Sequence, residues 1–329
     1  MRFREMGMVV VLAILYFSFA IVEPNMLKFG TFTTVLQQVS PVAIAGAWIT
    51  LVMVAGSLDL SVGGSIALSG VMTASVAASG TPVPIALFVG VLIGGLVGVI
   101  NSILVVRMKI NSVIATLGTL YVAHGIAFLK SNGLPQYTIP QPLITFGNGF
   151  SLDVPNPVWV MVVVVLLAWA VQRFTTLGRY SVAIGSNESA ARLSGIRVDR
   201  IRVILFIAAG LSAGLAGAVL AGQFNGDPNV VNEGWEFSVI VAAVLGGTSL
   251  SGGRGTVFGT LIGASIVGVL AAGLTIVGVN SFWQYVIEGI VLVAAVALDN
   301  RLRLLKRRQR PEREMPIPAG KAVAGGVDG

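Results

Sequence analysis

The chain has no cysteine, one histidine and few charged side chains. Without cysteine, disulfides, thiolate metal sites and cysteine nucleophiles are all excluded. Only 11% of the 329 residues are charged, where soluble proteins carry about 25%. In contrast, 55% are hydrophobic and the mean hydropathy is +0.89. We therefore expect an integral membrane protein, and the 41 glycines suit helices that pack closely in lipid.

The sequence also lacks a phosphate-binding loop of the form GxxxxGK[ST]. The glycine-rich run Gly252–Thr256 has the wrong spacing, and Arg254 stands where a lysine would be needed. Energy for any transport must therefore come from a partner subunit or from an ion gradient. The single histidine, His124, and the scattered acidic residues offer no paired acids and no Ser/His/Asp set, which disfavours a membrane enzyme. We expect no cofactor and no metal site.

Apolar runs of the length needed to cross a hydrocarbon core of about 30 Å recur along the chain. They predict an all-α membrane protein of about ten transmembrane helices, some of them short or interrupted by glycine. The expected ranges are 6–22, 39–55, 62–79, 83–106, 112–130, 157–174, 202–224, 237–248, 256–275 and 281–298.

The basic residues test this count, because loops that stay in the cytoplasm are enriched in lysine and arginine. With a cytoplasmic N-terminus, ten crossings place 19 of the 21 Lys and Arg inside and leave only Lys28 and Lys130 outside. Both termini are then cytoplasmic, and the net charge of +7 needs no nucleic acid to explain it. We expect a permease domain over 1–300 and a tail over 301–329 that is basic, contacts anionic lipid and then becomes disordered.

Two glycine-rich segments, 56–64 and 246–255, resemble each other, and each follows an apolar run. Glycine-interrupted helices at corresponding positions point to a translocation path, although tight turns between packed helices explain them equally well. Asp59 lies in the first segment, where it could cap the following helix. Polar residues in or between apolar runs are the candidates for the path: Asp59, Ser61, Asn101, Thr116, His124, Thr248, Ser249 and Glu288.

The longest inner connection, 175–201, contains a segment that predicts a short helix. Ser186 or Asn187 can cap its start, Glu188 falls in its first turn, Arg192 in its last, and Gly195 can close it. A capped helix in a cytoplasmic loop is typical of a docking element, whereas an interfacial helix lying on lipid is the alternative.

At this point four segments together resemble the bacterial ribose-type sugar ABC transporter permeases: GSLDLSVGG (56–64), NSVIATLGTLYVAHGIAF (111–128), TTLGRYSVAIGSNESAARLSGIRVDRIR (175–202) and VLGGTSLSGGRGTVFGTLIGA (244–264). The resemblance covers roughly residues 35 to 300, in order. It implies a permease like those of type II ABC importers in the bacterial inner membrane, with a second permease subunit (homo- or heterodimer), cytoplasmic ATP-binding subunits and a periplasmic sugar-binding protein.

The resemblance also implies roles for particular residues. The loop matching 186–196 is the coupling helix that docks on the ATPase, with Ser186, Asn187, Glu188, Ala191, Arg192, Leu193 and Gly195 as its candidate residues. The binding protein is expected to dock on outer loops that include Asp227, Glu233, Trp235 and Glu236, although Trp235 fits an interfacial aromatic belt better than a sugar contact. A secondary transporter of a small polar solute, coupled to protons or ions through Asp59, His124 or Glu288, is the alternative function.

Overall fold

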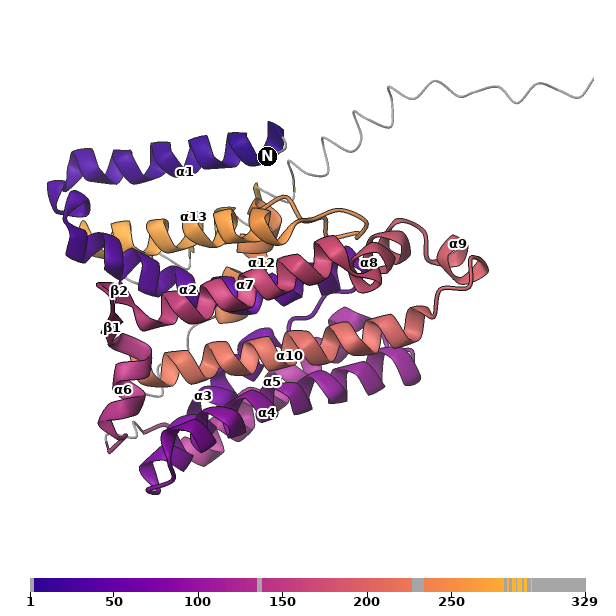
Figure 1. Cartoon of the computed structure of the whole chain (residues 1–329), viewed down its shortest axis with the longest axis horizontal. Helices are drawn as coiled ribbons and strands as arrows, with labels where there is room; N and C mark the ends of the chain where they lie inside the picture. The colour runs from indigo at the N-terminus through magenta and orange to yellow at the C-terminus, as the bar shows by residue number, and fades with distance from the viewer. Residues whose placement is uncertain are drawn as a thin grey trace, which may run out of the picture.

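The computed structural model describes residues 3–134, 138–226 and 234–280, together with residues 283, 286, 287, 289–291, 293, 294 and 297. Within these residues the fold is helical apart from one short hairpin (Figure 1). In chain order the elements are α1 (Phe3–Val22), η1 (Pro24–Leu27), α2 (Phe29–Val54), α3 (Val62–Ala78), α4 (Val83–Ser102), η2 (Ile103–Arg107), α5 (Ser112–Ser131), α6 (Gln141–Asn148), β1 (Phe150–Ser151), β2 (Val154–Pro155), α7 (Asn156–Phe174), α8 (Thr176–Ser186), α9 (Glu188–Leu193), α10 (Val198–Gln223), α12 (Trp235–Leu245) and α13 (Val257–Ile276).

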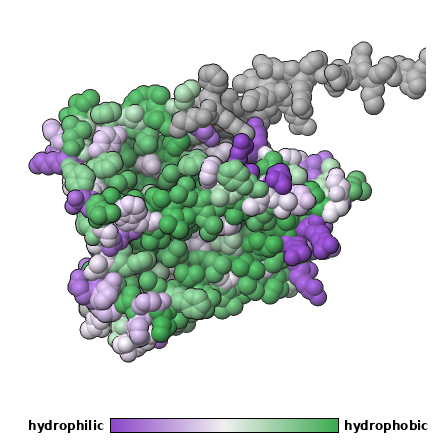
Figure 2. Space-filling view, in the orientation of Figure 1, coloured by the Kyte–Doolittle hydropathy of each residue, from purple (hydrophilic) through white to green (hydrophobic). Residues whose placement is uncertain are grey.

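Seven helices of the described part are long and apolar enough to cross a membrane, namely α1, α2, α4 with η2, α5, α7, α10 and α13. Two further apolar helices, α3 and α12, are shorter. Each of the first nine ranges expected from the sequence thus contains a helix. The tenth range, 281–298, lies largely outside the described residues, so the count of ten stays a prediction. Figure 2 shows a broad hydrophobic band along the side of the molecule between two more polar ends, as lipid contact requires.

Two helix boundaries differ from expectation for a physical reason. The second span begins at Phe29 rather than near residue 39, because the polar residues that lower the hydropathy of its start, Thr33, Gln37 and Gln38, are buried or half-buried in the bundle. Gln37, for example, accepts a hydrogen bond through its carbonyl from Gln223 Nε2 at 3.1 Å. Likewise α10 begins at Val198, four residues before its apolar run. Hydropathy alone misses such turns.

Glycines set the packing of the bundle. Helix α10 lies against α4, α3 and α2, and α13 lies against α2, α12 and α1. At the crossing of α4 and α10, a Cβ atom added to Gly94 would lie 2.6 Å from Gly214 Cα, and one added to Gly98 would lie 3.0 Å from Ile207 Cα. The two backbones are therefore in direct contact, which is the packing mode that small residues allow in membranes.

Candidate functional site

Between the spans α7 and α10 the chain forms two short helices, α8 and α9, which we call the excursion. Helix α9 lies beyond the bundle at one end of the molecule (Figure 1). We call this end the α9 end. Asn187 caps α9 by accepting a hydrogen bond from the Ala190 N–H at 3.0 Å. Gly195, with φ of +80°, follows the last turn. The short capped helix expected from the sequence is thus confirmed, with Asn187 as its cap, whereas Ser186 ends α8.

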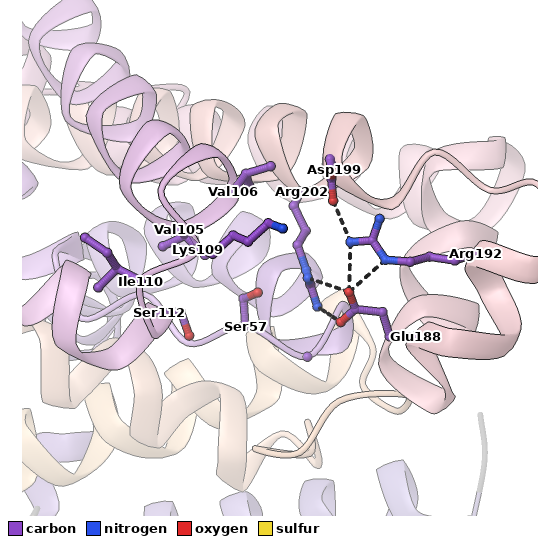
Figure 3. Close-up of a pocket in the computed structure, with 11 residues that line it drawn as sticks. Ser57, Val105, Val106, Lys109, Ile110, Ser112, Glu188, Arg192, Asp199 and Arg202 are labelled. Carbon is purple, nitrogen blue, oxygen red and sulfur yellow. Dashed lines mark hydrogen bonds and ion pairs between the residues drawn. The ribbon is translucent and has the colours of Figure 1, made fainter.

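Two ion pairs, Arg202–Glu188 and Arg192–Asp199, fasten α9 to the start of α10, and a third, Arg192–Glu188, lies within α9 (Figure 3). Arg202 donates to both carboxylate oxygens of Glu188, at 2.6 and 3.2 Å. Arg192 donates to Glu188 at 2.9 Å and to Asp199 at 2.6 Å. The hydrogen bonds from Arg202 lower the pKa of Glu188, and those from Arg192 act in the same direction. Arg202 and Asp199 were not among the residues predicted from the sequence, since nothing local links them to α9.

The two faces of α9 differ in exposure. Ala191 is buried and packs with Ile184 of α8 and Val198 of α10. Leu193, in contrast, is 90% exposed although it is a large apolar side chain. Helix α9 is thus held on one side through Ala191 and presents Leu193 to solvent on the other.

Three glycines from distant segments meet beneath this excursion. A Cβ atom added to Gly252 would lie 2.8 Å from Gly56 Cα and 3.0 Å from Gly185 Cα. The Gly253 N–H also donates to the Val54 carbonyl at 2.8 Å. The two similar glycine-rich segments therefore touch each other, and the end of α8 touches both. We call this contact of Gly56, Gly185 and Gly252 the glycine junction.

Four of the predicted path residues form one buried polar cluster. Thr119 donates to Asn101 Oδ1 at 2.7 Å, Asn101 Nδ2 to Ser61 Oγ at 2.6 Å, and Ser61 Oγ to Asp59 Oδ1 at 2.6 Å. The Thr116 hydroxyl accepts the Leu60 N–H at 3.0 Å. This chain joins α5, α4 and the turn before α3, and Thr119 is a member that the sequence did not reveal.

Asp59 itself is 2% exposed. Its Oδ1 accepts the backbone N–H of Ser61 at 2.9 Å, and Ser61 is the N-cap residue of α3. Asp59 therefore orders the turn that leads into α3 and does not bond the N–H groups of the helix itself.

The other predicted path residues lie apart from this cluster. His124 on α5 is hydrogen-bonded to the backbone of Gly63. Thr248 and Ser249 are buried in the loop after α12. Glu288 lies outside the described residues, as do two of the predicted docking residues, Asp227 and Glu233.

The first turns of the two short helices meet inside the protein. Helix α12 has 11 residues, about 16 Å at 1.5 Å per residue, which is too short to cross a membrane. Its Glu236 is 6% exposed, and the Glu236 carboxylate lies against Gly63 in the first turn of α3. Glu236 Oε2 and Trp235 Nε1 are buried without a hydrogen-bond partner among the described residues.

This placement differs from the outer-surface role expected for Glu236, because its side chain does not reach the surface. A carboxylate at two helix N-termini is favoured by the positive ends of both helix dipoles. Glu236 thus connects the two short helices, α3 and α12, and we call this contact the α3–α12 meeting point.

The chain is similar to known transport permeases. A family model described as "Branched-chain amino acid transport system / permease component" matches residues 31–296. The ribose import permease RbsC of Escherichia coli K12 is 36% identical over 301 residues, which cover 90% of this chain and 94% of the relative. RbsC of Bacillus subtilis is 38% identical over 300 residues, covering 91% and 93%. The L-arabinose permease AraH of Azospirillum brasilense is 34% identical over 305 residues, covering 92% and 90%.

No solved structure matches the chain. The family match spans most of the sequence and includes the excursion, the glycine junction and both short helices. This chain therefore belongs to the permease family of the branched-chain amino acid transport systems.

Proposed function

We propose that the chain is the membrane-spanning permease subunit of an ATP-binding-cassette importer that moves a monosaccharide across the bacterial inner membrane. The relatives named as ribose and arabinose permeases support this function and the sugar class. They do not favour the alternative of an ion-coupled secondary transporter. The permease is a transport subunit, and ATP hydrolysis belongs to a separate chain.

The observation that carries the proposal is the geometry of α9. Two ion pairs to α10 and the buried Ala191 hold α9 against α8 and α10, while Leu193 faces solvent. A rigid, projecting helix of this kind can transmit a displacement imposed by an ATP-binding subunit to the membrane-spanning helices, whereas a flexible loop would not transmit it. We assign α9 as the coupling helix on this ground.

The basic residues support a cytoplasmic position for the α9 end. Lys28 is the N-cap residue of α2 and Lys130 lies in the last turn of α5, so both lie at the opposite end. The hydroxyl of Thr256, at the start of α13, donates to Glu5 of α1 at 3.2 Å, which supports an N-terminus on the side of α9. The other Lys and Arg side chains of residues 5–280 belong to the α9 end: Arg107, Lys109, Arg173, Arg179, Arg192, Arg197, Arg200, Arg202 and Arg254.

The proposed partners follow from this assignment. ATP-binding subunits contact α9 from the cytoplasm, a second permease copy or a related permease completes the translocation path, and a periplasmic binding protein delivers the sugar at the opposite end. Movement of α9 would reach the path by two routes, through α10 and through the glycine junction.

The test replaces the exposed leucine of α9. Leu193→Glu places a charge where an apolar contact with the ATP-binding subunit is expected, so the assembled complex and ATP-dependent sugar uptake should both be lost. Leu152→Glu is the matched control, because Leu152 is 87% exposed and lies in the hairpin turn at the opposite end. Normal assembly and uptake with Leu193→Glu would overturn the assignment of α9. Uptake by energised vesicles that lack the ATP-binding subunit would overturn the importer itself.

A further inference from the structure

A cavity of about 490 Å³ lies at the α9 end, between α9 and the start of α10 on one side and η2 and the loop after α2 on the other (Figure 3). Its wall combines the ion-paired residues of α9 and α10 with the turn between η2 and α5 and with the start of the loop after α2. The cavity is larger than a bare ion needs and lies in the size range of small-molecule sites.

The charges around this cavity do not balance. Arg192 and Arg202 are paired with Glu188 and Asp199, which leaves Lys109 without an ion pair or hydrogen bond among the described residues. The Nε atom of Arg202 is also buried and has no hydrogen-bond partner in the described part of the chain. In Figure 3 the Lys109 side chain extends toward Arg202. Lys109 therefore carries a positive charge that is left for an anion, whereas Arg202 Nε has no accessible surface through which an anion in the cavity could reach it.

The backbone holds Lys109 in an uncommon conformation. Its φ is +56°, in the left-handed region that residues other than glycine rarely adopt. The preceding element, η2, is a turn of π-helix, which occurs frequently at functional sites. Such features are maintained only where the surrounding structure fixes them, and here they direct the Lys109 side chain toward the cavity.

The opposite wall is apolar. Val105 and Val106 of η2, together with Ile110, line the cavity beside Lys109. Two serines, Ser57 and Ser112, supply neutral hydroxyls on the same rim. A charged end and an apolar side fit an anion that carries carbon substituents, and a lysine beside an arginine is a common arrangement for binding phosphate oxygens.

We propose that this cavity binds a phosphate-bearing anion between Lys109 and Arg202. Such an anion comes either from the head group of an acidic phospholipid or from free phosphate in the cytoplasm. When bound, it bridges the turn before α5 and the first turns of α10, so it stiffens the support of α9. The binding itself does not depend on the proposed function.

The test uses the full-length permease in uncharged detergent. Native mass spectrometry counts bound phosphatidylglycerol, with phosphatidylcholine of the same acyl chains as the neutral comparison, and titration with inorganic phosphate is followed by thermal shift. Loss of the lysine charge in Lys109→Gln should weaken binding by about fivefold to tenfold. Lys109→Arg should retain it. Arg107→Gln is the matched control, since Arg107 is exposed two residues away and does not line the cavity.

Each outcome decides the proposal. Preferential retention of phosphatidylglycerol that depends on Lys109 supports the lipid source, and saturable phosphate binding with the same dependence supports the free anion. Absence of both would overturn the proposal. So would an equal loss in Arg107→Gln, because that result would indicate general attraction to a basic surface. Circular dichroism and the Lys109→Arg variant distinguish lost binding from lost folding.

Discussion

The crossing of α4 and α10 offers the sharpest test of the fold, through the substitution Gly94→Ala. The added Cβ atom would lie 2.6 Å from both Cα and N of Gly214 and closer still to the Gly210 carbonyl. Because carbon atoms pack at about 3.5 to 4.0 Å, the two backbones would have to separate by about 1 Å. Neither backbone can yield alone, since both contacting groups belong to helices.

The expected cost is that of overpacking, about 1–3 kcal/mol or more. Alanine favours the helix over glycine by about 1 kcal/mol, which offsets part of this cost. We therefore expect a lower free energy of unfolding and a lower melting temperature in detergent, together with reduced ATP-dependent uptake, because α10 supports α9. Gly118→Ala on α5 is the matched control, since no atom lies near the Cβ it would add.

The comparison is decisive because both variants add one methyl group to a membrane helix. Gly118→Ala should leave the melting temperature unchanged or raise it slightly. If Gly94→Ala melted at the temperature of Gly118→Ala, the close contact between α4 and α10 would be refuted, and the route from α9 through α10 would lose its basis.

Three further predictions follow from the site. Asn187→Ala removes the cap of α9 and should cost about 1 kcal/mol of local helix stability, visible as faster amide exchange in α9 alone; unchanged exchange would contradict the capping role. Because the pKa of Glu188 is lowered in the folded protein, its ion pairs stabilise fully above the ordinary value near 4.5 and are lost as the pH falls through the lowered value; exchange of α9 should accelerate in that acidic range, and Glu188→Gln should remove this dependence on pH. Gly63→Ala would drive a methyl group into the Glu236 carboxylate and should destabilise by about 1–3 kcal/mol; Glu236→Ala should be milder in that background than alone, and strictly additive losses would show that the two residues do not touch.

Features that depend on neighbouring residues were predictable from the sequence. Apolar length located nine helices within a few residues at most ends, and the order Asn187, Glu188, Gly195 was enough to predict α9 with its cap. Both signals are local, because a helix and its caps are set by residues within a turn of each other. The start of α2 was missed because its polar side chains lower the hydropathy, although one of them bonds a distant partner: Gln37 Nε2 donates to the Asn148 carbonyl at 3.5 Å.

Features that depend on distant contacts were not predictable in detail. The sequence indicated that the segments 56–64 and 246–255 are similar, yet only the fold shows that Gly56 and Gly252 touch. It placed Glu236 in an outer loop, because the helix expected there begins at residue 237 and the count of crossings puts the preceding connection outside. The short α12 instead begins within the protein, where the first turn of α3 receives the carboxylate.

The same distant contacts explain how a small movement of α9 could reach the interior. α9 is fixed to α10 by ion pairs, and α10 lies in backbone contact with α4, so these elements must move together or break packing. The neighbouring α8 is fixed through Gly185 to the loops that precede α3 and follow α12. Both loops belong to helices whose first turns face each other at Glu236. A displacement of α9 is therefore expected to change the α3–α12 meeting point, because close backbone contacts link α8 to both loops.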